Sequence, residues 1–330
     1  MNENVDQFLI KSGIEFKKNF TLSKLSYVRT GGISRRFIEL DNINDLKKLL
    51  NYFQTEDINF QIFGNYSNVV IRDGFIETPI LKLMFKRLEI EQNSIYASSD
   101  ILIPKLSKIL SKMGISGFSK LYGIPGTVGG GIYMNAECYE QHLTDNLSNV
   151  FCIDDKGNEL VLSKEQLDLK WRSSAFHTKF RHLIIVGASF TINRSSAELQ
   201  MKIFNKYDEE RKKYQETKYP NLGSVFKTKD LYKDISNKFI VYKLGIYLIR
   251  IYVKLFTKYR HAAFSKLARS FTLWYFRIEK NHKVFFSDYT INTVCNLGGN
   301  SIDIIEFIND FQKKIDYSQE LEIEVYDQIK

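Results

Sequence analysis

The residues of this chain that could do chemistry are concentrated in one glycine-rich stretch, Gly123 to Gly131, in which five of nine positions are glycine. Because glycine has no Cβ, such a stretch can adopt positive φ and let several peptide N–H groups converge on an anion. It has neither the Gly-Lys-Ser/Thr of a Walker loop nor the G-x-G-x-x-G spacing of a Rossmann turn. The pattern therefore favours another kind of diphosphate loop; the alternative is a tight turn between buried elements.

The residues around this stretch support a ligand site. Ile132 to Ala136 is an apolar segment with a single amide, Asn135, and suits an element packed beneath a flat ligand. A second polar loop, Gly64-Asn65-Tyr66-Ser67-Asn68, follows a short apolar strand. By itself this loop is typical of an ordinary turn. Together with the glycine-rich stretch it becomes a second candidate phosphate contact.

Hydrophobic patterns predict the elements that must position these loops. In the first third of the chain we expect helices over 4–11 and from a cap at Asn42, Asn44 or Asp45 to Phe53. We expect strands over 27–30, 37–40, 60–63, 69–71 and 79–83, with a glycine turn at Gly31-Gly32 between the first two. Farther along we expect hairpins over 88–97 and 150–162, a strand over 183–190, a helix from a cap at Asp100 to Met113, and a helix over 197–215. Strands and helices do not alternate regularly, which predicts an α+β fold.

Composition restricts the class of protein. With 330 residues, 44% of them apolar, the chain is long enough for two or three globular domains. Three scattered cysteines, Cys138, Cys152 and Cys295, indicate neither a disulfide framework nor a zinc site, and five ungrouped histidines give no support for a metal site. Residues 1–7 lack a secretory-signal pattern, so we expect a reducing, cytoplasmic location.

The formal net charge of +9 is concentrated in one segment. Residues 231–284 contain twelve Lys and Arg against two acidic residues, a local charge of +10 that leaves the rest of the chain close to neutral. This distribution argues against a protein that coats nucleic acid. The excess charge requires an explanation specific to this segment.

Part of the basic segment has an amphipathic helical pattern. On a helical projection, one side carries Lys243, Tyr247, Arg250, Lys254, Lys258 and His261, and a broad opposite side carries Leu244, Leu248, Ile251, Tyr252, Leu255 and Phe256. The cations interrupt the apolar span too often for a transmembrane helix. Two interpretations remain: residues 236–260 contact an anionic membrane peripherally, or they pack on the C-terminal domain or a second subunit.

Three polar residues, Arg172, Ser224 and Glu324, are candidates for catalysis, although each also has an ordinary explanation. Arg172 can rest against the neighbouring Trp171. Ser224 can be a turn hydroxyl, and Glu324 alternates with apolar residues, as a solvated strand position does. Taken one at a time, these residues do not define a site.

Taken together and in order, six motifs resemble the UDP-N-acetylenolpyruvoylglucosamine reductases, also called UDP-N-acetylmuramate dehydrogenases, the flavoenzymes of peptidoglycan precursor synthesis. The motifs are Arg29-Thr30-Gly31-Gly32, Gly64-Asn65-Tyr66-Ser67-Asn68, Gly123-Ile124-Pro125-Gly126-Thr127-Val128-Gly129-Gly130 with Tyr133-Met134-Asn135-Ala136, Trp171-Arg172-Ser173-Ser174, Gly223-Ser224-Val225-Phe226-Lys227, and Leu321-Glu322-Ile323-Glu324-Val325. They cover most of the chain outside 231–284.

The resemblance implies a fold and a set of cofactor contacts. The fold would be an FAD-binding fold of the vanillyl-alcohol-oxidase (PCMH) type in two α+β subdomains, 1–84 and 85–195. A C-terminal α+β substrate domain, 196–330, would carry the basic aromatic insertion at about 231–284. The residues expected along the FAD are Gly31, Gly64, Asn65, Ser67, Asn68, Gly123, Pro125, Gly126, Thr127, Gly129, Gly130 and Asn135.

The resemblance also implies a reaction, the reduction of UDP-N-acetylglucosamine enolpyruvate to UDP-N-acetylmuramate by NADPH through FAD. Ser224 would be the proton donor, and Arg172 and Glu324 would polarise the substrate carboxylate and the enolate-like intermediate. A serine hydroxyl is a weak acid, so it protonates only a strongly basic carbanion within hydrogen-bond reach. The guanidinium of Arg172 suits a carboxylate because it can donate two parallel hydrogen bonds.

The chain departs from the family pattern in the C-terminal domain. Lys227 is followed by Thr228-Lys229-Asp230 where the family usually has Asn-Pro, and Tyr289-Thr290-Ile291-Asn292-Thr293 replaces a typical Lys-His-Ala-Asn-Phe run. A related FAD oxidoreductase for another nucleotide sugar or alcohol in surface-polysaccharide synthesis is therefore an alternative. A non-catalytic, membrane-peripheral flavin-fold protein is another.

Overall fold

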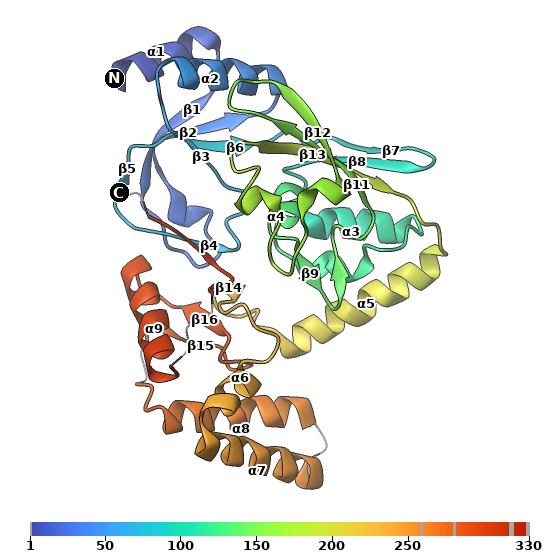
Figure 1. The fold of residues 1–330 in the computed structure, drawn as a ribbon, viewed down its shortest axis with the longest axis vertical. Helices are drawn as coiled ribbons and strands as arrows, with labels where there is room; N and C mark the ends of the chain where they lie inside the picture. Colours follow the sequence, from blue (N-terminus) through green and yellow to red (C-terminus); the bar gives the residue numbers. More distant parts are fainter. Residues whose placement is uncertain (1, 258–259, 280–281, 317–319, 328–330) are drawn as a thin grey trace. The chain divides into compact units, whose positions relative to one another are not determined.

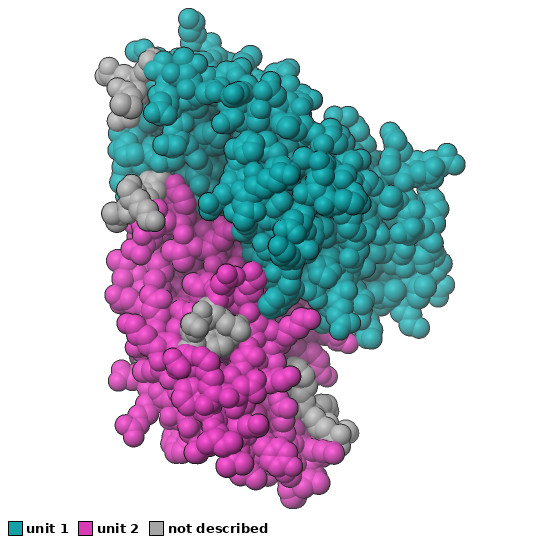
Figure 2. Space-filling model, in the orientation of Figure 1, with its two compact units in different colours: residues 1–21, 33–66, 75–209 teal, residues 22–32, 67–74, 210–330 magenta. Residues whose placement is uncertain are grey.

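The computed structural model describes residues 2–257, 260–279, 282–316 and 320–327. The chain forms two compact units (Figure 2). Unit 1 comprises residues 1–21, 33–66 and 75–209, and unit 2 comprises 22–32, 67–74 and 210–330. Two short segments from the first quarter of the chain therefore belong to the C-terminal unit.

The first sheet of unit 1 is mixed and packs against two helices. Its strands are β1 (Phe16–Thr21), β2 (Ile33–Leu40), β6 (Ile80–Leu83) and β3 (Gln61–Ile62) in that order, with β5 (Phe75–Ile76) also paired to β2. Only β1 is antiparallel to its neighbour. Helices α1 (Asn2–Ser12) and α2 (Ile43–Thr55) bury Leu9, Leu49 and Phe53 against this sheet (Figure 1). Asn42 caps α2 through the N–H of Asp45, as its position predicts.

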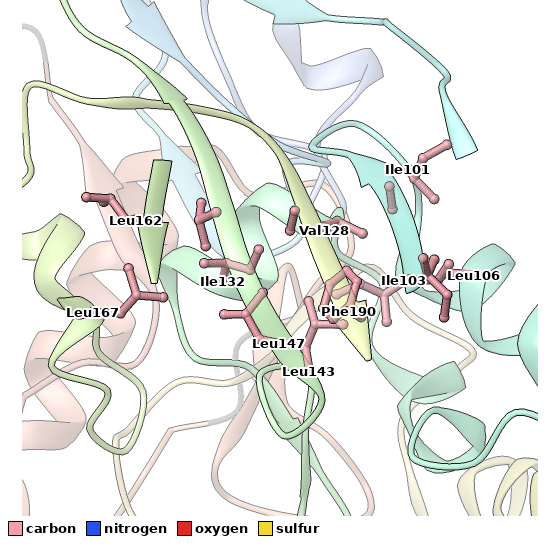
Figure 3. Packing of buried hydrophobic residues seen from close by; sticks show 14 of the residues in the cluster. Ile101, Ile103, Leu106, Val128, Ile132, Leu143, Leu147, Leu162, Leu167 and Phe190 are labelled. Carbon is pink, nitrogen blue, oxygen red and sulfur yellow. The ribbon is translucent and has the colours of Figure 1, made fainter. Parts of the chain in front are cut away.

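The second sheet of unit 1 is antiparallel throughout. Its order is β12 (Glu159–Ser163), β11 (Leu147–Ile153), β13 (Ile184–Thr191), β8 (Ser94–Ser98) and β7 (Leu88–Ile90). Helices α3 (Ile103–Lys112) and α4 (Val128–Tyr133) contribute to its core. Figure 3 shows Val128 and Ile132 of α4 among Ile103 of α3, Leu147 of β11 and Phe190 of β13. The glycine-rich stretch thus runs directly into a buried helix.

Shorter elements complete unit 1. They are β9 (Glu137–Cys138), β10 (Gln141–His142) and the 3-10 turns Ser119–Gly123, Lys164–Leu167 and Ala175–His177. Helix α5 (Ala197–Tyr214) begins in unit 1 and ends in unit 2.

Unit 2 combines a small sheet with a helical segment. The strands β14 (Asn221–Ser224), β16 (Thr293–Asn296) and β15 (Val284–Phe286) form an antiparallel sheet, and β17 (Glu324–Tyr326) pairs in parallel with β4 (Val69–Ile71). The helices are α6 (Leu231–Lys238), α7 (Ile240–Phe256), α8 (Arg260–Tyr275) and α9 (Ser301–Lys314), and a 3-10 turn covers Leu22–Lys24. Helices α7 and α8 pack side by side (Figure 1). Within the described ranges, none of the helices combines the length and apolar character needed to span a bilayer.

Most predicted elements are confirmed, including both hairpins, the helix after Asn42, the helix starting at Ala197 and the mixed α+β character. The strand predicted over 27–30, before the glycine turn, is wrong. The main chain of this segment and of the turn instead bonds to distant residues of unit 2: the Asn296 amide donates to the Val28 carbonyl and the Gly31 N–H donates to Asp73. The domain boundaries at 84 and 195 remain a prediction.

Asp100 does not cap a helix, so that prediction is also wrong. Helix α3 begins only at Ile103, with Pro104 in its first turn. The Asp100 carboxylate accepts hydrogen bonds from the Lys86 N–H and the Ser98 hydroxyl instead. A local cap was replaced by contacts with the preceding hairpin.

Close packing explains the first glycine of α4. The Gly129 N–H donates to the Ser99 carbonyl at 2.8 Å, and a Cβ on Gly129 would lie 2.8 Å from the Ser99 Cβ. At Gly130 a Cβ would meet only the Thr127 Oγ1, at an ordinary 3.5 Å. Two adjacent glycines of one helix therefore differ in how much space a side chain would have.

We expect Gly129→Ala to destabilise the apoprotein by about 1–3 kcal/mol, because the added methyl overpacks against Ser99. Gly130→Ala is the matched control and should be neutral or stabilising by up to about 1 kcal/mol, since alanine favours a helix over glycine. Thermal melting of the two apoproteins measures the difference. Equal melting temperatures would contradict the packing explanation.

Candidate cofactor and catalytic site

The two polar loops of unit 1 meet in space. The Asn65 amide donates to the Pro125 carbonyl at 2.6 Å. A Cβ on Gly64 would lie 2.9 Å from the Thr127 Oγ1, so a larger residue would require the Thr127 hydroxyl or a loop to shift. The junction of these loops, Gly64 to Tyr66 with Pro125 to Thr127, is called the loop junction below. The sequence-predicted convergence of the two loops is therefore present within unit 1.

Lys82 holds one side of the loop junction. Its Nζ donates to the Gly64 carbonyl at 2.8 Å and lies 5.0 Å from the centre of the Tyr66 ring. Burial lowers the pKa of Lys82, and the charges of Asp100 and Glu39 partly oppose that shift. Sequence reasoning missed this residue because a lysine in strand β6 carries no local signal of a partner eighteen residues away.

The backbone N–H groups of the two loops divide into two sets. Those of Gly129 and Gly130 are occupied by the Ser99 carbonyl and the Thr127 hydroxyl. By contrast, the N–H groups of Gly64, Tyr66, Gly126 and Thr127 donate to no other residue in the described part of the chain. Buried or half-buried N–H groups seek an acceptor, so the loop junction fits an anionic group such as a diphosphate.

A buried hydroxyl at the same loop has no protein partner either. Tyr66 has φ +54° and is 2% exposed. Its hydroxyl finds no hydrogen-bond partner among the described residues, and burial raises its pKa. A buried polar atom without a partner is costly unless a ligand or water satisfies it. The Tyr66 hydroxyl is therefore available to a ligand or a water molecule at the loop junction.

Asn135 and Ser174 join the end of α4 to the segment that carries Arg172. The Asn135 amide donates to the Lys170 carbonyl at 2.9 Å and accepts from the Thr144 hydroxyl at 2.6 Å. The Ser174 hydroxyl donates to the Tyr133 carbonyl at 2.6 Å. Asn135 is thus engaged with the protein, and its contact with a cofactor remains a prediction.

Arg172 lies at the tip of a tight turn in unit 1. Lys170 and Ser173 exchange backbone hydrogen bonds of 3.0 and 3.2 Å on either side of it, and Arg172 has φ +53°. This left-handed conformation is strained for a residue with a side chain. One guanidinium nitrogen donates to the Glu137 carbonyl at 3.2 Å. The turn presents the arginine in a defined position.

The remaining cofactor candidates, Gly31, Ser67 and Asn68, lie in unit 2. The segment of Asn68 bonds to residues near the C-terminal end of the chain. The Asn68 amide donates to the Glu322 carbonyl, and the Asn68 carbonyl accepts from the Glu324 N–H, both at 2.9 Å. Gly31 donates to Asp73, whose other carboxylate oxygen accepts from the Ser301 N–H at 2.6 Å. Asp73 is a positioning residue that sequence reasoning missed, although its Asp-Gly pair signals a turn.

Ser224 and Glu324 lie on neighbouring segments of unit 2. Ser224 ends β14 and is paired with Thr293. The next residue, Val225, accepts a hydrogen bond of 2.8 Å from the Glu322 N–H, two residues before Glu324. The structure therefore brings two of the three predicted catalytic residues into one unit, while Arg172 belongs to the other.

Asn292 fixes the strand that carries Ser224. Its side-chain oxygen accepts from the Phe226 N–H at 2.7 Å, and its amide donates to the Phe226 carbonyl at 3.1 Å. Its own carbonyl accepts from the Val225 N–H at 2.8 Å.

No metal-binding group of three or more His, Cys, Asp or Glu side chains occurs among the described residues.

Comparison with known proteins identifies the family. A family model described as an FAD binding domain matches residues 34–163, which include both segments of the loop junction. The UDP-N-acetylenolpyruvoylglucosamine reductase of Rickettsia massiliae (strain Mtu5) is 34% identical over 214 residues, or 64% of this chain and 71% of the relative. The chain belongs to the UDP-N-acetylenolpyruvoylglucosamine reductase family. The Staphylococcus aureus (strain Newman) member is 28% identical over 214 residues.

The fold of this reductase family extends over nearly the whole chain. The crystal structure of the Thermus caldophilus UDP-N-acetylenolpyruvylglucosamine reductase matches with a TM-score of 0.70 at 19% identity, and covers 95% of this chain and 100% of its own. The predicted α+β FAD-binding fold of the PCMH type with a C-terminal α+β domain is confirmed.

Asn292 is also the one residue of the family's Lys-His-Ala-Asn-Phe run that this chain retains, and its contacts supply a reason. We expect Asn292→Ala to destabilise the protein by about 1–3 kcal/mol, because the N–H of the buried Phe226 loses the Asn292 oxygen as acceptor and the Phe226 carbonyl keeps the Thr228 N–H but loses the Asn292 amide. Asn292→Asp should lose less, since its carboxylate still accepts from the Phe226 N–H.

Thermal melting measures this effect. Asn237→Ala, at an exposed position of α6, is the control and should leave the melting temperature nearly unchanged. An Asn292→Ala protein that melts with the wild type would show that the paired hydrogen bonds to Phe226 do not hold this strand.

Proposed function

We propose that this chain is an FAD-dependent reductase that converts UDP-N-acetylglucosamine enolpyruvate to UDP-N-acetylmuramate with NADPH, in peptidoglycan precursor synthesis. Membership of the family carries the proposal. The FAD-binding match and the N–H donors of the loop junction, which have no acceptor among the described residues, support the assignment of the cofactor. We place the activity in the cytoplasm, in keeping with three free cysteines.

The loop junction would hold the diphosphate of the cofactor. The N–H groups of Gly64, Gly126 and Thr127 would donate to its oxygens, and Lys82 would keep the Gly64 carbonyl turned toward the protein. When bound, FAD supplies the hydride for the enolpyruvyl double bond after its reduction by NADPH. From the family resemblance, Gly31, Ser67 and Asn68 are proposed as further cofactor contacts.

Three side chains of this chain would complete the reaction. The Ser224 hydroxyl would give its proton to the carbon next to the substrate carboxylate, where negative charge develops. Arg172 would hold that carboxylate through two N–H groups. Glu324 would donate a hydrogen bond to the substrate oxygen that gains negative charge. Only a protonated Glu324 can do this, because a carboxylate accepts but does not donate hydrogen bonds.

Anaerobic titration tests the proposal directly. The purified protein should be yellow, NADPH should bleach its flavin, and UDP-N-acetylglucosamine enolpyruvate should restore the colour. A protein that takes up no FAD would overturn the cofactor assignment. Flavin that is reduced but reoxidised only by another nucleotide sugar would favour the alternative acceptor, for which the altered segments 228–230 and 289–293 are the specific reason.

Replacement of Ser224 separates proton donation from flavin chemistry. We expect Ser224→Ala to lower kcat by about 10²–10⁴-fold, the usual contribution of a positioned acid. Reduction of the flavin by NADPH should stay within about twofold of the wild-type rate, since that step requires no proton from Ser224. Ser270→Ala, at an exposed α8 hydroxyl bonded to the Lys266 carbonyl, is the control. Wild-type turnover by Ser224→Ala would assign the proton to another group.

We also propose that residues 236–260 make peripheral contact with an anionic membrane. The local charge of +10 in 231–284 supports this proposal, as does the exposure of the apolar side chains predicted for one face of the helix. Of the predicted basic side, Lys258 and the side chain of His261 lie outside the described residues.

A further inference from the structure

Packing within unit 2 sets which side of α7 faces away from the protein. Tyr242, Ile246 and Val253 are buried. The Tyr242 ring stacks on Phe271 of α8 at 5.4 Å, and its hydroxyl bonds to the Thr272 hydroxyl at 2.7 Å. These contacts attach one side of α7 to α8, so its rotation about its own axis is set.

The opposite side of α7 is continuously apolar and exposed. At 100° per residue, seven side chains fall within about 120° of the helix circumference. This apolar arc consists of Ile240, Val241, Leu244, Leu248, Ile251, Tyr252 and Leu255, which are 37–68% exposed. Scattered exposed hydrophobic residues are common, but a contiguous row of this kind marks an interaction surface. The interpretation that this face packs on its own domain is thereby excluded.

Cations line one edge of the apolar arc. Lys243, Arg250 and Lys254 fall within about 40° of one another on the same projection. Lys243 and Lys254 are exposed. Arg250 is held near the protein by Asp230 at 3.6 Å and by the Phe264 ring at 5.3 Å. The helix thus presents an apolar face with a positively charged border.

The positive charge of α7 and its surroundings indicates what binds to the apolar arc. A second copy of the chain would bring another basic segment of charge +10 against the first, which like-charge repulsion opposes. A bilayer that contains anionic lipid offers negative headgroups for the lysines and acyl chains for the aliphatic side chains. The cations along one edge suit a helix that lies in the interface and does not cross it.

We infer that α7 lies in the plane of an anionic bilayer surface, with the apolar arc inserted at the boundary of headgroups and acyl chains and Lys243 and Lys254 at the lipid phosphates. The inference rests on the proposed membrane contact of residues 236–260 and deepens it by assigning the face, the orientation and the lipid chemistry. It is independent of the reductase reaction, because no residue proposed for cofactor or substrate binding lies on α7.

Flotation of the full-length protein with vesicles tests the inference. The vesicles contain phosphatidylcholine alone or with phosphatidylglycerol. We expect retention on the anionic vesicles, weakened by salt, and at least a tenfold lower partition coefficient for Leu248→Glu/Leu255→Glu. Lys243→Glu/Lys254→Glu should lose most of the preference for anionic over neutral vesicles. Because these side chains are exposed, the variants should keep the wild-type melting temperature.

Matched controls come from unit 1. Ile10→Glu replaces a 69% exposed aliphatic residue of α1, and Lys105→Glu reverses an exposed charge of α3. Both should float like the wild type. Turnover of a soluble substrate should be the same in all of these proteins, so a failure of the reductase proposal is seen separately.

Each of the other possible results contradicts a particular part of the inference. Retention that survives both α7 variants would refute the inference and leave a peripheral contact elsewhere on the protein. Absence of retention at low salt would refute the contact and the inference together. Equal retention on neutral and anionic vesicles would refute the role of the lysines. A dimer in sedimentation that Leu248→Glu/Leu255→Glu dissociates, without lipid binding, would assign the apolar arc to a second copy.

Discussion

The close approach of two backbone loops in unit 1 is the constraint on which the proposed cofactor site depends. Asn65 donates to the Pro125 carbonyl, and Gly64 leaves no room for a Cβ beside Thr127. The contact leaves peptide N–H groups without protein acceptors at one place. A Cβ at Gly64 would force the Thr127 hydroxyl or one of the loops to shift, so the arrangement of these N–H groups depends on backbone proximity.

The C-terminal unit uses a different principle, in which segments far apart in the chain complete one another. Strand β17 pairs with β4, and the Asn68 amide reaches Glu322 across more than 250 residues. Asp73 similarly bonds to the start of α9. Because the residues just before β17 also bond to Val225, through a separate bridge between Phe226 and Leu321, Ser224 and Glu324 lie on adjoining segments. The catalytic candidates of this unit are therefore positioned by hydrogen bonds that no local pattern specifies.

Helix α7 satisfies two requirements on opposite sides. Aromatic contacts with α8 bury one side, while the other side remains exposed and apolar. A helix that only stabilised unit 2 would gain nothing from seven exposed hydrophobic side chains, since their burial is what lowers free energy. The exposed side of α7 therefore does not contribute to the folding of unit 2.

The amino-acid sequence alone determined the order of the motifs, the α+β class, both hairpins and the amphipathic helical pattern within 236–260, because periodicity and turn residues act over a few positions. Only the tertiary structure decided which N–H groups of the glycine-rich stretch stay available, since Gly129 loses its donor to Ser99. It likewise diverted Asp100 from capping α3, recruited Lys82 and Asn292, and exposed the apolar arc. These outcomes depend on contacts between residues that are distant in sequence, and a local sequence pattern does not show which distant residues will meet.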